Sequence, residues 1–101
     1  MKIEWSVLAE NQLRSIYEYY YLKTSPSIAK ISTNKIIEKV SILKKNPYVG
    51  QKEELLIDYP EDFHYLVEGN YKIIYWIKEQ TITIAAVFDC RQNPVKLKKI
   101  K

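Results

Sequence analysis

The order of apolar and polar positions at the start of the chain predicts a short strand followed by a helix. Residues 2–5 alternate polar and apolar side chains, which is typical of a strand with one buried face. Ser6 comes next, and its hydroxyl can accept a hydrogen bond from an unpaired N–H of a first helical turn. Apolar residues then recur at intervals of three and four over residues 7–23, as on a helix with one buried stripe. The predicted stripe consists of Leu13, Ile16, Tyr17 and Tyr20.

A second helix is predicted over residues 26–45. Ser25 is a candidate N-cap, and Pro26 suits the first helical position because it lacks the N–H that would be unpaired there. The helical pattern ends at Asn46-Pro47, since a proline disfavours the helical conformation of the residue before it. The turn between the two helices is very short, so we expect an antiparallel helical hairpin. The predicted buried stripe of this helix consists of Ile28, Ile31, Ile36, Val40 and Leu43.

Residues 46–62 show neither period, and we expect them to be irregular. Pro60 interrupts regular structure there, and within the segment no basic residue after Lys52 is present to pair with its acidic side chains. Those acidic side chains are Glu53, Glu54, Asp58, Glu61 and Asp62.

The remainder of the chain predicts a meander of three strands over residues 63–68, 71–78 and 81–88. Gly69-Asn70 is a two-residue turn in which both residues tolerate a positive φ. In the last strand, alternation predicts one face from Ile82, Ile84, Ala86 and Phe88, and the other from Thr81, Thr83, Ala85 and Val87. The order β–α–α–β–β–β indicates an α+β fold, with the helical hairpin packed on one face of a small, mainly antiparallel sheet.

Length and composition narrow the class of protein. The chain has 101 residues, of which 47% are hydrophobic, and this fits one domain over residues 1–101 with a single core. Cys90 is the only cysteine, which excludes an internal disulfide framework and a multi-cysteine zinc site. No apolar run approaches the roughly 20 residues of a membrane span, and no signal peptide is recognisable. We therefore expect a cytoplasmic protein with no cofactor and no membrane partner.

The positive charge is concentrated at the C-terminus. The formal net charge is +4, from 16 basic and 12 acidic residues. Five of the basic residues and none of the acidic ones lie from Arg91 onward, which leaves 11 basic against 12 acidic residues in positions 1–90. We therefore expect a nearly neutral body and a basic tail over residues 91–101. Such a tail suits the backbone of a nucleic acid or an acidic protein segment, and the alternative is a solvated chain end.

Four segments carry a resemblance to a known family. They are Ile3-Glu4-Trp5-Ser6, Leu43-Lys44-Lys45-Asn46-Pro47 with Gly50, residues 65–75 (YLVEGNYKIIY), and residues 87–94 (VFDCRQNP). In this order and spacing they resemble the RelE/ParE superfamily of toxins from bacterial type II toxin–antitoxin systems. The resemblance implies a cognate antitoxin protein as partner. It also implies one of two targets, because RelE-like members cleave mRNA in the ribosomal A site whereas ParE-like members poison DNA gyrase and are not nucleases.

The resemblance also marks candidate residues. RNA cleavage through a 2′-hydroxyl needs a base, an acid and cations at the phosphate. The basic positions of RelE-like toxins match Lys72 in the middle strand, Arg91 after the last strand and His64 in the strand before Gly69, whereas a further basic position matches Leu66. The C-terminal tyrosine or histidine of many RelE-like toxins has no counterpart after Arg91. The incomplete acid/base set favours ParE-like growth inhibition over a RelE-like nuclease, and a non-toxic interaction module on the same fold is the third alternative.

Each candidate also has a structural alternative. Arg91 either contacts a target or antitoxin, together with Lys96, Lys98 and Lys99 of the tail, or forms a salt bridge to Asp89 or the acidic segment. Lys72 either lies beside a phosphate or is an exposed lysine at a strand end. His64 has a reference pKa suited to proton transfer, but a single histidine on a strand is more often structural.

Two further residue types receive structural interpretations. We expect Cys90 to be a small, half-buried side chain. Of the tyrosines that crowd the first helix, we expect Tyr17 and Tyr20 to pack in the core, and Tyr19 and Tyr21 to lie on the surface, where they can contact a protein.

Overall fold

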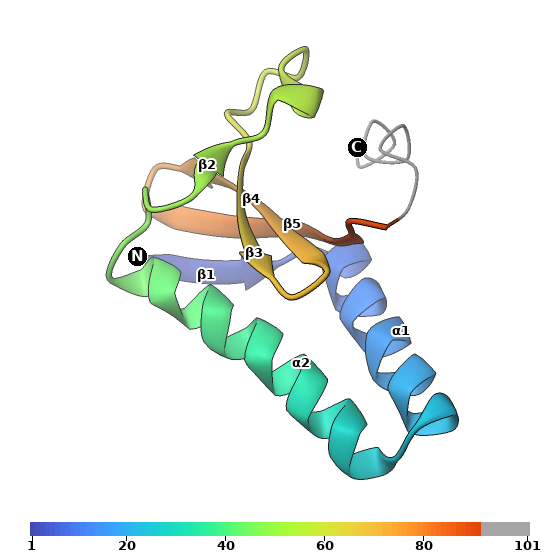
Figure 1. The fold of residues 1–101 in the computed structure, drawn as a ribbon. Helices are drawn as coiled ribbons and strands as arrows, with labels where there is room; N and C mark the ends of the chain where they lie inside the picture. The colour runs from blue at the N-terminus through green and yellow to red at the C-terminus, as the bar shows by residue number, and fades with distance from the viewer. Residues whose placement is uncertain (92–101) are drawn as a thin grey trace.

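The structure, a computed structural model, describes residues 1–91 and arranges them as two helices on a five-stranded sheet (Figure 1). The helices are α1 (Val7–Lys23) and α2 (Pro26–Ser41). The strands are β1 (Lys2–Trp5), β2 (Gln51–Lys52), β3 (His64–Glu68), β4 (Tyr71–Lys78) and β5 (Thr81–Asp89). Two short 3-10 turns, η1 (Ile42–Lys44) and η2 (Glu54–Leu56), follow α2 and β2. The predicted α+β fold, a helical hairpin on one face of a mainly antiparallel sheet, is confirmed.

The first and last strands are neighbours in the sheet, whose order is β1-β5-β4-β3-β2. β1 runs parallel to β5 and pairs with it from Lys2 opposite Thr81 to Trp5 opposite Ile84. The other neighbouring strands are antiparallel. Because β1 ends at Trp5, the second half of β5 has no strand on that side and lies against α1 instead. This open half of β5 becomes one wall of the candidate site.

Both helices begin where the sequence predicts. The Ser6 hydroxyl accepts a hydrogen bond from Ala9 N at 3.0 Å and caps α1, and Ser25 Oγ accepts from Ile28 N at 3.2 Å and caps α2. Ser6 Oγ also donates to the Ala85 carbonyl at 2.9 Å, which ties the start of α1 to β5. The second helix is α-helical only to Ser41, and its predicted last turn is the 3-10 turn η1, a common way for a helix to tighten at its end.

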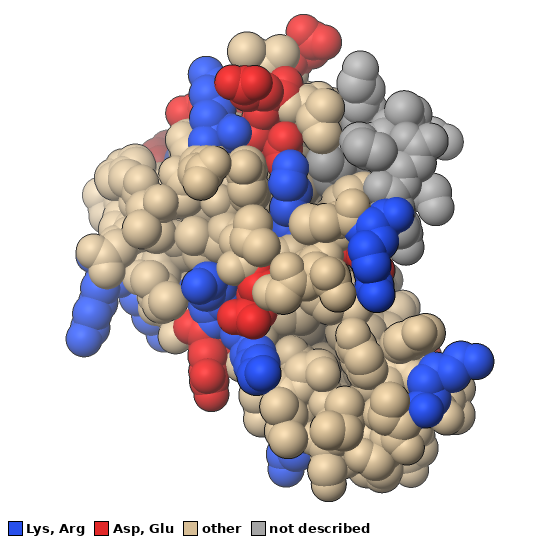
Figure 2. All heavy atoms as spheres, viewed as in Figure 1, with Lys and Arg blue, Asp and Glu red and all other residues tan. Residues whose placement is uncertain are grey.

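The sheet separates two apolar clusters. Toward the helices, Ile36 and Val40 of α2 and Ile16 of α1 pack against Ile73 and Tyr75 of β4 and their neighbours. On the other face, the segment between β2 and β3 folds over the sheet, and its Leu56 and Phe63 pack on Ile74 and Phe88. The acidic residues of this segment gather at the top of the molecule in the view of Figure 2.

The expectation that residues 46–62 are wholly irregular is wrong in two places. Gln51 and Lys52 form β2, which pairs with Tyr65 and His64 of β3, and residues 54–56 form η2. A two-residue polar strand carries no alternation of its own, because its stability comes from pairing with β3.

The predicted faces of β5 are correct only in its first half. Ile74 of β4 pairs with Ala86, but Tyr75 pairs with Ile84, so Ala85 is an extra residue that forms a β-bulge. Ile84 faces the helices before the bulge. After it, Ala86 faces away from them. A bulge places two residues opposite one and therefore reverses the alternation, which the residue pattern does not reveal.

The helical hairpin is less buried than its sequence suggests. Ile28 and Ile31 are 42% and 51% exposed, and the small residues Ala29 and Thr33 are buried in their place. This half of α2 lies near the helix–helix turn, which projects beyond the sheet (Figure 1), so only a narrow face toward α1 is covered.

The tyrosines of α1 follow the prediction in part. Tyr17 is 36% exposed and lies outside the core, so its predicted burial is wrong. Tyr20 is partly buried against the core, and Tyr19 and Tyr21 are exposed as predicted.

Candidate functional site

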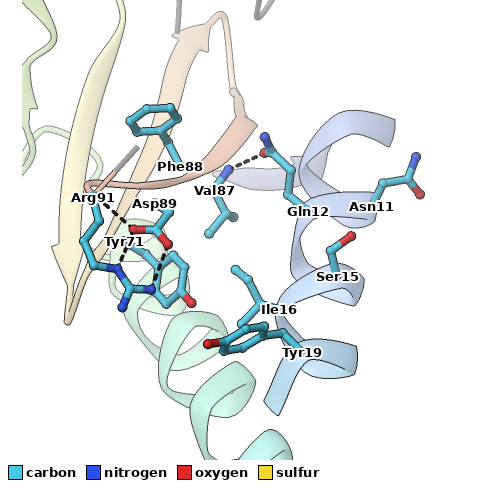
Figure 3. A pocket seen from close by; sticks show the side chains of 10 residues that line it. All are labelled: Asn11, Gln12, Ser15, Ile16, Tyr19, Tyr71, Val87, Phe88, Asp89 and Arg91. Carbon is cyan, nitrogen blue, oxygen red and sulfur yellow. Dashed lines mark hydrogen bonds and ion pairs between the residues drawn. The ribbon is translucent and has the colours of Figure 1, made fainter. Parts of the chain in front are cut away.

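The end of β5 brings a carboxylate and a guanidinium together (Figure 3). Asp89 is the last residue of β5, and Arg91 follows two positions later. The main-chain N of Arg91 donates to Asp89 Oδ1 at 2.9 Å, while its side chain donates from Nε to Oδ1 at 3.0 Å and from Nη2 to Oδ2 at 2.8 Å. This two-pronged geometry matches the planar fork of an arginine. The hydrogen bond from the Arg91 side chain lowers the pKa of Asp89, so the pair is ionised at neutral pH.

A hollow of about 510 Å³ lies between this pair and α1. Polar side chains of α1 form one wall, and the end of β5 forms the other (Figure 3). The lining residues are Asn11, Gln12, Ser15, Ile16, Tyr19, Tyr71, Val87, Phe88, Asp89 and Arg91. The lining combines amide, hydroxyl and charged groups with aromatic surface.

The hollow exists because α1 replaces β1 as the neighbour of β5. Beyond Ile84, the backbone groups of β5 on this side have no strand partner. Side chains of the helix satisfy them instead, since Gln12 Oε1 accepts a hydrogen bond from Val87 N at 2.7 Å and Ser6 Oγ donates to the Ala85 carbonyl. Because a helix is wider than a strand, the backbone of α1 lies further from β5 than a paired strand would, and side chains span the distance between them.

Tyr71, which lines the hollow, is hydrogen-bonded to a second tyrosine. The Tyr71 hydroxyl, opposite Asp89 in the sheet, lies 3.5 Å from the Tyr20 hydroxyl of α1 and donates to it. Burial, together with this hydrogen bond, raises the pKa of Tyr71 well above its usual value, so its hydroxyl is neutral. At the outer rim, the Arg91 side chain is 57% exposed and presents a cation to solvent. The hollow therefore has a mixed polar and apolar lining, with an exposed cation at its rim.

Arg91 thus lines the hollow. It also forms the salt bridge to Asp89 that was predicted as its structural alternative. Engagement of a phosphate or carboxylate by this guanidinium would compete with Asp89 or use its remaining exposed edge.

Lys72 lies on the other face of the sheet. Its Nζ forms an ion pair with Glu53 Oε2 at 2.8 Å and lies 4.3 Å from the centroid of the Tyr65 ring. The Glu53 side chain is only 3% exposed, and its Oε1 accepts a hydrogen bond from Leu55 N. The expectation that the acidic segment has no basic partner is therefore wrong for Glu53, and Lys72 is not the exposed strand-end lysine of the structural alternative.

His64 lies in a third environment. It pairs across the sheet with Tyr75, so its ring is on the helix side, with its centroid 6.0 Å from that of the Tyr75 ring. Its Nδ1 lies 3.1 Å from the Asp62 carbonyl oxygen, to which it donates when Nδ1 carries the proton.

The structure does not bring the three predicted nuclease residues together. His64 pairs with Tyr75 of β4, and Lys72 lies three residues before Tyr75 on that strand. Because side chains alternate between the two faces along a strand, His64 and Lys72 lie on opposite faces of the sheet. Asp89, the ion-pair partner of Arg91, is opposite Tyr71 of β4, whereas His64 is opposite Tyr75, four residues further along the same strand. Four residues of strand span roughly 13 Å, and β4 itself lies between the two strands.

Other predicted positions have mixed outcomes. Cys90 is exposed, so its predicted half-burial is wrong. It is exposed because the strand has ended and only its backbone N is held, by the Asn70 carbonyl at 2.7 Å. Lys96, Lys98 and Lys99 lie outside the described residues.

Sequence reasoning missed the α1 wall of the hollow. Asn11, Gln12 and Ser15 were not singled out, and Tyr19 was predicted only to lie on the surface, although the four form a line of uncharged side chains at helical spacing. This line of uncharged side chains could have indicated a binding surface, because the solvent-exposed face of an amphipathic helix commonly carries charged residues.

Within residues 1–91, no group of three or more His, Cys, Asp or Glu side chains is arranged to hold a metal ion. In the same part of the chain, no helix is long and apolar enough to cross a membrane.

Comparisons with known proteins agree with this architecture. Residues 3–94 match the family model of the ParE toxin of the type II toxin–antitoxin system parDE. Among solved structures, the chain is similar to a chain of the chromosomal ParDE toxin–antitoxin system from P. aeruginosa, with a TM-score of 0.73 and 21% sequence identity over 88% of this chain and 95% of that one. A search of curated proteins finds no match. Since the family model spans nearly all of the sequence, the chain belongs to the ParE toxin family of type II toxin–antitoxin systems.

Proposed function

We propose that this ParE-family toxin inhibits growth by binding DNA gyrase, and that its cognate antitoxin neutralises it by covering the hollow beside Arg91. The observation that carries the proposal is the separation of Arg91, Lys72 and His64. A RelE-type nuclease needs a base, an acid and cations around one phosphate. Here Lys72 is bound to Glu53 on the face of the sheet that does not carry His64, which supports action by binding rather than by acid/base chemistry.

The hollow supports the antitoxin contact. It offers a cation at its mouth, amides and hydroxyls along α1, and the rings of Tyr19 and Phe88. The sequence that follows Arg91 adds lysines and no acidic residue. A peptide with a carboxylate near an aromatic or aliphatic side chain fits this chemistry. In this proposal, Arg91 and the tail residues Lys96, Lys98 and Lys99 are contacts of the antitoxin or of the target.

The test is a supercoiling assay with purified gyrase and the purified chain. We expect the wild-type chain to inhibit supercoiling, and co-expressed antitoxin to remove the inhibition. Arg91→Ala is expected to weaken inhibition or antitoxin binding, whereas Lys78→Ala, which removes an exposed cation of the same sheet, leaves both unchanged. Circular dichroism of both variants separates loss of contact from loss of fold. Wild-type chain that leaves gyrase unaffected at large molar excess would refute the gyrase target.

The alternatives are tested with the same preparation. A translating extract in which the wild-type chain cuts mRNA, and Arg91→Ala does not, would establish the nuclease and overturn action by binding. Induction of the chain without its antitoxin distinguishes a toxin from a non-toxic module, because only a toxin arrests growth.

A further inference from the structure

The side of α1 away from the hollow carries a second surface. Val7, Glu10, Arg14 and Tyr17 recur at helical spacing and form one line along the helix, which we call the outer stripe. Val7 is 75% exposed and Tyr17 is 36% exposed. An α-helix turns by about 100° per residue, which places the stripe roughly 150° around the helix axis from Gln12, Ser15 and Tyr19, the side chains that line the hollow. The two surfaces of α1 therefore face different directions.

Beside the outer stripe runs a shallow groove between the two helices. Leu13 and Tyr17 of α1 and Thr33 and Ile37 of α2 line it, together with the charged side chains of the stripe. Ile37 is 46% exposed, so the groove adds apolar surface to that of Val7 and Tyr17. Exposed apolar surface of this kind marks an interaction site when it is contiguous and bordered by charge.

The charges of the stripe are not paired with each other. Glu10 and Arg14 have the i, i+4 spacing at which an ion pair commonly forms within a helix. Arg14 instead donates from Nη1 to Asn11 Oδ1 at 3.1 Å, and no ion pair among residues 1–91 includes either Glu10 or Arg14. Both charges are thus available to a partner that carries the complementary charges at the same spacing.

We propose that this partner is a second copy of the chain, with α1 packed antiparallel against α1 through the outer stripe. When the two-fold axis passes level with position 12, Glu10 of each copy faces Arg14 of the other, and Val7 faces Tyr17. Both pairings arise from one register, and each contact occurs twice, as an isologous interface requires. A parallel arrangement in register would instead place Glu10 against Glu10 and Arg14 against Arg14, which is repulsive.

Charge reversal tests the interface. The full-length chain is examined by analytical ultracentrifugation, and we expect a dimer for the wild type. Glu10→Arg and Arg14→Glu are each expected to weaken the dimer by about tenfold or more, since each replaces two ion pairs with two like-charge contacts. The combined variant Glu10→Arg/Arg14→Glu restores the pairing and with it the dimer. Glu38→Arg, on the exposed face of α2, is the matched control and leaves the dimer unchanged.

Cross-linking tests the register directly. Cysteines at positions 7 and 17 of one helix are about 15 Å apart, too far for a disulfide within one chain. In a Cys90→Ser background, which removes the exposed native thiol, Val7→Cys/Tyr17→Cys is expected to form a covalent dimer on oxidation, with a 7–17 peptide link identified by mass spectrometry. Val7→Cys/Glu38→Cys is the control that gives no 7–38 link.

Several outcomes would overturn the proposal. A wild-type chain that stays monomeric over the whole accessible concentration range excludes the dimer. This holds also if the charge reversals weaken antitoxin binding, since the outer stripe would then contact the antitoxin instead of a second copy. A dimer that survives both single reversals, or that the combined variant fails to restore, places the interface elsewhere. The outcomes are distinguishable from those of the gyrase assay, because one experiment measures self-association and the other measures inhibition of supercoiling.

Discussion

Replacing Lys72 by methionine provides a direct test of its role as a structural residue. The substitution keeps the apolar part of the side chain and removes the ammonium group, whose Nζ lies over the Tyr65 ring. The Glu53 carboxylate, 3% exposed, then loses the partner that lies 2.8 Å from its Oε2 and keeps only the hydrogen bond from Leu55 N. We expect a large loss of stability, because a buried carboxylate without its counter-charge is costly.

The magnitude follows from the burial of the two groups. Breaking a buried ion pair by removing one partner lowers the free energy of unfolding by about 3–5 kcal/mol. Because the Lys72 side chain is 23% exposed and water can partly replace it, we expect about 3 kcal/mol, near the lower end of that range. For a domain of this size the melting temperature falls by about 12 °C or more. In Lys72→Met/Glu53→Gln no charge is left unpaired, and the loss is expected to be about 1 kcal/mol.

Urea denaturation followed by circular dichroism measures these free energies. Lys78→Met is the matched control, because Lys78 lies at the exposed end of the same strand, and its replacement is expected to change the free energy of unfolding by less than about 0.5 kcal/mol. If Lys72→Met is as stable as the wild type, or if the double variant is as unstable as Lys72→Met, the assignment of Lys72 as the partner of a buried carboxylate is wrong. Lys72 would then be free to act on a target.

Three further changes are expected to have measurable effects. Gly50→Ala places a Cβ in collision with the Tyr75 hydroxyl and is expected to lower the free energy of unfolding by about 1–3 kcal/mol, whereas an unchanged urea midpoint would show that the loop adjusts freely. Ser6→Ala removes both the cap of α1 and the hydrogen bond to the bulged part of β5, so a loss of about 2 kcal/mol is expected, and a loss under about 0.5 kcal/mol would contradict it. Arg91 lowers the pKa of Asp89, so their pairing stabilises the fold above the ordinary aspartate pKa of about 3.9, and this contribution is lost as the pH falls through the lowered value. The difference in free energy of unfolding between wild type and Arg91→Gln is therefore expected to be larger near neutral pH than at pH 2, and equal differences would exclude this account.

The elements that sequence predicted well depend on local chemistry. Ser6, Ser25 and Pro26 mark the starts of both helices because capping satisfies the N–H groups of the first turn within a few residues. The turn at Gly69 was equally predictable, since its φ of 59° suits a residue without a side chain. The bulge at Ala85 was not, because it depends on how β4 and β5 pair over their whole length.

The candidate site shows the same division. Arg91 was identified from its position after the last strand, and its pairing with Asp89 was one of the two alternatives considered, since the residues are only two positions apart. The pair Lys72–Glu53 was missed because 19 residues separate the partners and the intervening segment has no periodicity. The α1 wall of the hollow was missed because Gln12 gains its role from Val87, which is 75 residues away in the sequence.

The sequence by itself determined the order and nature of the helices, the strands of the meander, the family and the basic C-terminus, because periodicity, caps and turns act over a few residues. The tertiary structure decided which charged residues meet. Lys72 and His64 are eight positions apart and look like members of one basic site, yet the pleat sends them to opposite faces of the sheet. The early end of β1, by leaving half of β5 to α1, created the hollow where Arg91 lies. Such outcomes follow from strand register and from the packing of distant segments, which no local pattern of residues encodes.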